Sequence, residues 1–97
     1  MILEHLAKLQ VSPAIGPRAG WRESIRHARA TVAELLEAIP SLCRTLQEVV
    51  AREMPRARSL VAGALADHGE EPSVALDSVD YEVADVIGTF FPTGPAP

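Results

Sequence analysis

The feature that most constrains this 97-residue chain is a regular apolar stripe that begins at its only tryptophan. Apolar residues recur there at alternating intervals of four and three positions: Trp21, Ile25, Ala28, Val32, Leu35 and Ile39. At about 100° per residue these positions share one face of a helix. Pro40 follows the stripe and cannot continue a helix. The spacing predicts an amphipathic helix over 21–38 whose apolar face, Leu35 included, is buried.

A shorter helix is predicted before this one, over 2–10, and residues 11–20 between them predict a connecting loop. Two prolines and two glycines in that ten-residue stretch prevent a continuous helix. The apolar positions that give the first helix its period are Ile2, Leu3, Leu6 and Leu9.

A third helix is predicted to follow Pro40. Ser41 is placed to cap its N-terminus with a side-chain hydrogen bond. Pro55 lies inside its apolar pattern, so it either kinks one long helix or starts a new one. The helical period then continues to His68, and Gly69 is a natural left-handed stop.

The C-terminal third predicts a short last helix near 79–87, capped by Ser78 or Asp80, with a β-strand as the competing interpretation. Phe90, Phe91 and Pro92 are expected to fold back onto the helices as an aromatic plug. Taken together, the segments predict an all-α fold, a small bundle of four to five helices. We expect one domain over residues 1–92 and a frayed tail over 93–97.

Composition excludes several classes of protein. No apolar run is long enough to span a bilayer, and the first residues lack the basic and small-residue elements of a secretory signal, so we expect a cytoplasmic protein. The single cysteine, Cys43, excludes an internal disulfide framework and a cysteine-based zinc finger.

Charge is divided unevenly along the chain. Residues 1–58 hold all nine lysines and arginines with six acids, a net charge of +3, whereas residues 59–97 hold seven acids and no lysine or arginine, a net charge of −7. Such asymmetry fits a basic binding face with an acidic tail. It fits equally two halves that pack with complementary fields, and we favour this second interpretation.

Four stretches of the chain together resemble a known family. Gly20–Leu42 reads GWRESIRHARATVAELLEAIPSL, with its Trp, Ser-Ile, Arg, Leu-Leu and Pro-Ser-Leu landmarks. HLAKLQ at 5–10, MPRAR at 54–58 and FFP at 90–92 are similar to further landmarks of the same family, the bacterial domain-of-unknown-function family DUF29. The resemblance implies an all-helical cytoplasmic protein whose activity is unknown.

The chain also departs from the family pattern. Met54 stands where the family usually has tyrosine. Relatives usually carry a further helical segment before the first helix, and a core without that segment exposes apolar surface that needs cover.

The best candidate for a binding feature is a row of arginines on one flank of the second helix. Arg22, Arg26 and Arg29 are spaced by four and three residues, and Arg18 lies just before them. Such a row can contact successive phosphates of a nucleic acid. The alternative is that these side chains cover the core and pair with acids of the same chain. We favour the alternative, because no aromatic platform accompanies the row and the net charge is −4.

Catalytic chemistry has weak support in the sequence. Three histidines, His5, His27 and His68, show no paired ligand spacing, so we expect no metal and no cofactor. His27 is expected to face solvent, and Cys43 to be a buried apolar residue rather than a nucleophile. A metal or thiol enzyme built from His5, His68 and Cys43 is the interpretation we favour least.

The favoured function is therefore protein–protein interaction or self-association without catalysis, and nucleic-acid binding by the arginine row is the alternative. We expect a two-fold homodimer, or a helical protein partner. The first helix has few charged residues to solvate it, so we expect its apolar residues Ile2, Leu3, Leu6 and Leu9 in the interface.

Overall fold

The computed structural model describes residues 2–92, and these residues form helices without any strand. The helices are α1 (Ile2–Val11), α2 (Arg18–Ala38), α3 (Leu42–Asp67), the short 3-10 helix η1 (Leu76–Ser78) and α4 (Val83–Ile87). The prediction of a small all-α bundle is confirmed. None of the described helices is both long and apolar enough to cross a membrane.

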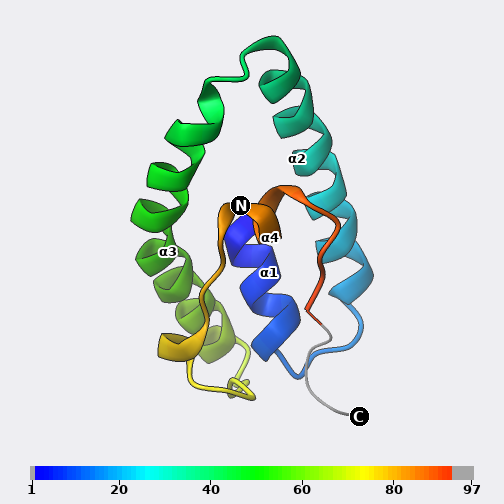
Figure 1. The fold of residues 1–97 in the computed structure, drawn as a ribbon. Coiled ribbons are helices and arrows are strands. Elements are labelled where there is room, and N and C mark those ends of the chain that lie inside the picture. The colour runs from blue at the N-terminus through cyan, green and yellow to red at the C-terminus, as the bar shows by residue number, and fades with distance from the viewer. Residues whose placement is uncertain (1, 93–97) are drawn as a thin grey trace.

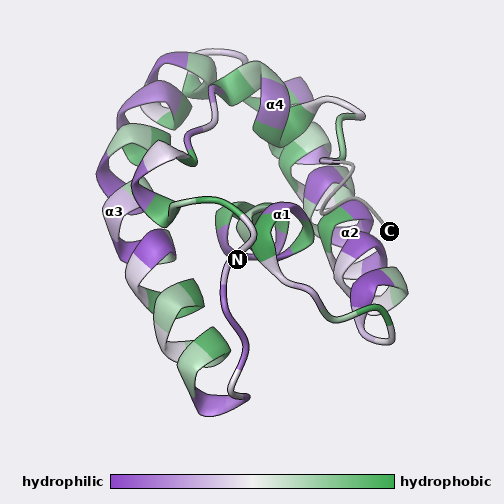
Figure 2. Cartoon of the chain, turned by 90° about the horizontal axis from the view of Figure 1, so that it is seen from below, coloured by the Kyte–Doolittle hydropathy of each residue, from purple (hydrophilic) through white to green (hydrophobic). Residues whose placement is uncertain are grey.

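The helices α2 and α3 form a long hairpin that holds α1 between its legs. Figure 1 shows the two helices converging where the chain turns, with α1 and α4 lying between them farther down. Viewed from below, α1 lies between α2 and α3 (Figure 2). The molecule is elongated, with principal extents of 42 × 24 × 21 Å. We call residues 32–49 the tip of the hairpin and the part that holds α1 and α4 its base.

The short helix α1 is the centre of the core. Leu6, Ala7, Leu9 and Val11 are fully buried, and Leu3 is 8% exposed. A ten-residue helix is marginal by itself in water, so the packing of α2 and α3 around it accounts for its stability. This placement corrects the expected dimer interface, because Leu3, Leu6 and Leu9 are enclosed by their own chain and Ile2 packs against the same core.

The predicted second helix is confirmed as α2, although it begins at Arg18, inside the predicted loop, and only part of its stripe is buried. Ile25 is 1% exposed and Trp21 packs against the core, whereas Leu35 and Ile39 are 50% and 48% exposed. The prediction of a buried Leu35 is wrong, and helix length gives the reason. The ten residues of α1 span about 15 Å, whereas the 21 residues of α2 span about 31 Å. The elements that pack between α2 and α3 therefore cover only the base.

One continuous helix, α3, runs through Pro55 and ends where the sequence predicts. Gly69 has a φ of 65°, its N–H donates to the Ala66 carbonyl, and the N–H of Glu70 donates to the Leu65 carbonyl at 2.8 Å. This is the Schellman pattern of helix termination. At the other end, Ser41 precedes the helix without a capping side-chain bond. Its backbone is already helical, whereas a capping residue is extended.

The C-terminal segment crosses the base and differs from the prediction in its details. Residues 76–78 form η1, which the sequence did not predict, and α4 is only five residues long. Its N-cap is Glu82, not Ser78 or Asp80, and the Glu82 N–H donates to the Asp85 carboxylate at 3.0 Å. Phe91 packs against the core as a plug would, while Phe90 remains 42% exposed. The expected tail at 93–97 lies outside the described residues.

Candidate functional site

The predicted arginine row is divided by the structure into internal and external side chains. Arg29 is 8% exposed, and it donates to three backbone carbonyls: from Nε to Val86 at 2.7 Å, and from Nη2 to Asp85 at 2.7 Å and to Phe90 at 2.6 Å. The last carbonyls of a helix have no partner within the helix. Arg29 therefore closes the C-terminus of α4.

Arg18 binds the C-terminal end of α1 in the same way as Arg29 binds that of α4. Its Nη2 donates to the Leu9 carbonyl at 2.7 Å, in the last turn of that helix. Burial lowers the pKa of the Arg18 and Arg29 guanidinium groups, which remain charged donors as arginines do in proteins. Arg22 and Arg26 alone are left for an external anion, and Arg26 lies 5.2 Å from the Phe91 ring centroid. This corrects the expectation that four arginines form one phosphate-binding row.

Arginine side chains also join the basic and acidic halves of the chain. Arg58 donates from Nε to the Val79 carbonyl at 2.8 Å and forms a 3.6 Å ion pair with Asp80. Together with Arg29, it holds the acidic C-terminal segment against the hairpin. The two halves are therefore packed together, as the favoured interpretation of the charge pattern expects, but most of these contacts are to backbone carbonyls rather than to carboxylates.

The residues that would build an enzyme are dispersed. Cys43 is exposed at the start of α3, so the expectation that it is buried is wrong. His68 follows the other end of the same 26-residue helix, about 39 Å away. The His27 side chain is exposed, which confirms that it faces solvent, and its Nε2 atom lies 3.8 Å from the Glu23 carboxylate. Within residues 2–92, no three His, Cys, Asp or Glu side chains are grouped so that they could hold a metal ion.

His5 is a partly buried histidine at the base. Its Nδ1 atom is buried and has no hydrogen-bond partner among the described residues. Burial lowers the pKa of its imidazole, with a further contribution from the positive charge of Lys8. Burial therefore disfavours the charged form of His5.

The tip carries a group of apolar side chains that the rest of the described residues leave without full cover. Leu35 and Ile39 are half-exposed, and the neighbouring apolar side chains are only partly buried. We call this set the tip surface: Val32, Leu35, Leu36, Ile39, Leu42, Leu46 and Val49. The tip surface is therefore a partly exposed apolar face.

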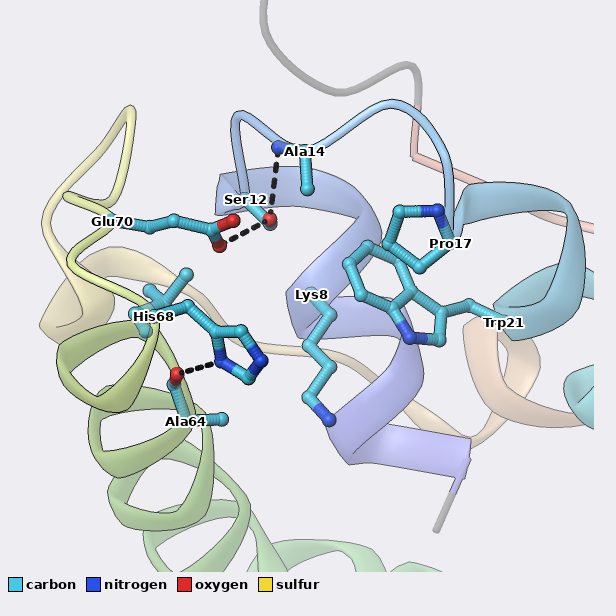
Figure 3. A pocket seen from close by; sticks show the side chains of 9 residues that line it. Lys8, Ser12, Ala14, Pro17, Trp21, Ala64, His68 and Glu70 are labelled. Atoms are coloured by element: carbon cyan, nitrogen blue, oxygen red, sulfur yellow. Dashed lines mark hydrogen bonds between the residues drawn. The ribbon is translucent and has the colours of Figure 1, made fainter.

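A pocket of about 210 Å³ lies at the base, where the end of α1, the start of α2 and the end of α3 meet. Figure 3 shows Trp21 on one side of this pocket and His68 on the other, with the Lys8 side chain between them. Ser12 donates to the Glu70 carboxylate at 3.1 Å on the same side as His68. The sequence did not predict this pocket, because its lining residues come from separate segments that share no spacing.

Comparison with known proteins gives a family and no function. The family model described as domain of unknown function DUF29 matches residues 1–84 of the chain. No curated protein and no solved structure matches it.

Proposed function

The chain belongs to the DUF29 family, whose function is unknown, and we propose that it is a self-association module whose tip surface binds the tip surface of a second copy. The observation that carries the proposal is the half-exposed state of Leu35 and Ile39 on the stripe whose other end is core. Two hairpins paired through these faces bring together four helices with their apolar sides inward, an arrangement typical of helical bundles. The surface is self-complementary under two-fold symmetry.

The expected affinity is modest. Burying the exposed halves of Leu35 and Ile39 in both copies contributes about 3–6 kcal/mol. Association costs about 4–15 kcal/mol in lost freedom, so the partly buried members of the tip surface must supply the remainder. We therefore expect a dissociation constant in the micromolar range.

The proposal contains no catalytic step. Cys43, the nucleophile considered in the sequence, lies at the opposite end of α3 from His68. Nucleic-acid binding is not proposed, because Arg18 and Arg29 are bound to carbonyls of their own chain.

Sedimentation equilibrium over a micromolar concentration series tests the proposal. The unmodified chain is expected to pass from monomer to dimer, and Leu35→Glu to remain a monomer. Leu60→Glu is the matched control, because Leu60 is 54% exposed on α3 and lies about 27 Å from Leu42 along that helix. Circular dichroism establishes that both variants keep their helices.

An unmodified chain that stays monomeric throughout the series, or a Leu60→Glu variant that dissociates as readily as Leu35→Glu, contradicts self-association through the tip.

A further inference from the structure

We infer that the pocket at the base, between Lys8, Trp21 and His68, binds a small aromatic monocarboxylate. The pocket lies in the base and the tip surface lies in residues 32–49, so this inference is independent of the proposed self-association. Four features of the pocket support the inference: an enclosed cation, aromatic walls, a suitable volume and a lining carboxylate that already accepts a hydrogen bond.

The cation is Lys8, whose side chain is only 19% exposed. Its ammonium contacts Glu4 at 3.5 Å, a long distance compared with the roughly 2.7–2.9 Å of a strong charge-assisted hydrogen bond. Because an ammonium group has three donors, this single contact leaves Lys8 with unused hydrogen-bonding capacity. A ligand carboxylate in the pocket would satisfy it better than Glu4 does.

The walls favour a flat, apolar body behind that carboxylate. Trp21 and His68 stand on opposite sides (Figure 3), and the nearly buried Leu65 and the ring of Pro17 complete the lining. The His68 ring is held by a 2.8 Å hydrogen bond from Nδ1 to the Ala64 carbonyl. The Lys8 ammonium already lies 5.9 Å from the Trp21 ring centroid. A planar ring bound in the pocket would lie between these two side chains, with its carboxylate toward Lys8.

The volume suits a single ring. An apolar cavity of about 150 Å³ accommodates benzene. The present pocket, at about 210 Å³, therefore has room for one aromatic ring and a carboxylate.

The acid is Glu70, and it restricts the charge of the ligand. Its carboxylate accepts a hydrogen bond from Ser12 at 3.1 Å, and the Ser12 oxygen accepts one from the Ala14 N–H at 3.1 Å. This chain fixes a negative charge on the side of the pocket that His68 also lines. A second carboxylate on the ligand would be repelled there, so monocarboxylates are preferred over dicarboxylates.

Benzoate is the probe for the test, and the indole N–H resonance of Trp21 is the readout, because the chain has one tryptophan. We expect a saturable chemical-shift change in the millimolar range or tighter. Benzyl alcohol keeps the ring and removes the charge, whereas cyclohexanecarboxylate keeps the charge and removes the ring. Both are expected to bind at least several-fold more weakly, and phthalate, with two carboxylates, more weakly than benzoate.

Two substitutions on α1 give opposite expectations. Lys8→Met keeps most of the side-chain volume and should weaken benzoate binding about tenfold or more, because it removes a charge-assisted contact. Glu4→Gln removes the competitor for Lys8 and should strengthen binding about twofold. Unchanged thermal unfolding of both variants shows that the pocket itself persists.

The Leu35→Glu variant keeps this test apart from the self-association test, because a monomer with an intact base should bind benzoate as the unmodified chain does. The inference is overturned if benzoate gives no saturable shift, if benzyl alcohol binds equally well, or if Lys8→Met binds benzoate unchanged. Binding lost in Leu35→Glu would mean that the site depends on the dimer, and would overturn the assignment to one chain's base.

Discussion

The base and the tip of the hairpin use the same two helices and the same apolar spacing, yet only the base is a core. At the base, Ile25 and Val61 are 1% and 0% exposed, whereas at the tip Leu35 and Ile39 remain half-exposed. The difference is the presence of α1 and α4 between the legs of the base (Figure 1). An apolar stripe therefore shows that a helix face needs cover, but the cover itself is set by the lengths of the other elements.

The helix ends differ between the two regions in the same way. At the base, Gly69 terminates α3 with a positive φ, and Arg18 and Arg29 bind the last carbonyls of α1 and α4. At the tip, Ser41 precedes α3 without a capping side-chain hydrogen bond. The side-chain and glycine contacts that end these helices are therefore found at the base.

The largest effect on stability is expected from truncating a buried side chain at the centre of the base. Leu6→Ala removes a fully buried side chain and should lower the free energy of unfolding by about 2–5 kcal/mol. Leu35→Ala, on the 50% exposed tip, should lower it by about 1 kcal/mol or less in the monomer. Urea unfolding at concentrations below the dimer range measures both. Equal losses for the two variants would mean that base and tip form one core after all.

A smaller effect is expected from releasing α4 from the base. Arg29→Met removes three hydrogen bonds to backbone carbonyls and should cost about 2–4 kcal/mol. Arg26→Met is the control on the same helix. It loses an exposed contact with the Phe91 ring, worth about 0.5–1 kcal/mol. If Arg26→Met destabilises the chain as much as Arg29→Met, the carbonyl contacts are not what holds α4.

Two glycines near the base end of α3 should respond to alanine with opposite signs. Gly69 has a φ of 65°, so Gly69→Ala forces a left-handed alanine and should cost about 1–2 kcal/mol. Gly63 lies inside the helix, and Gly63→Ala should stabilise the chain by about 0.5–1 kcal/mol. A Cβ at either position meets no atom within 4 Å, so backbone conformation alone sets the sign. A stabilising Gly69→Ala would show that α3 is not stopped by this residue.

Periodicity and local chemistry account for what the sequence could predict of this fold. The C-terminal end of α2, the stop at Gly69 and the all-α class depend on residues that are neighbours along the chain. The buried position of α1 could not be predicted, because few charges around Leu6 and Leu9 are equally consistent with a core helix and with an interface helix. The exposure of Leu35 depends on the relative lengths of α1 and α2, which no local pattern contains.

The candidate sites show the same limit. Arg18, Arg22, Arg26 and Arg29 are equivalent on a helical wheel, but Arg18 and Arg29 lie next to the ends of other helices and bind their carbonyls. The pocket around Lys8 joins three segments that are distant in sequence, and only the third dimension brings Trp21 and His68 to opposite walls. Spacing identifies residues that share a helix, not residues that share a cavity.

The smallest expected effect is a pH dependence that belongs to the base alone. Burial lowers the pKa of His5 below its ordinary value of 6.5, with a further contribution from Lys8 that Glu4 opposes. The unfolded chain therefore binds a proton at His5 more readily than the folded chain does. The contribution of neutral His5 to stability is complete above pH 6.5 and is lost as the pH falls below that value.

Urea unfolding between pH 7.5 and about pH 5.5, above the range where carboxylates titrate, should show this loss of stability. His5→Gln should reduce it. Because the tip surface contains no titratable side chain, dimerisation should not follow the same curve. A slope that survives in His5→Gln would place the titrating group elsewhere.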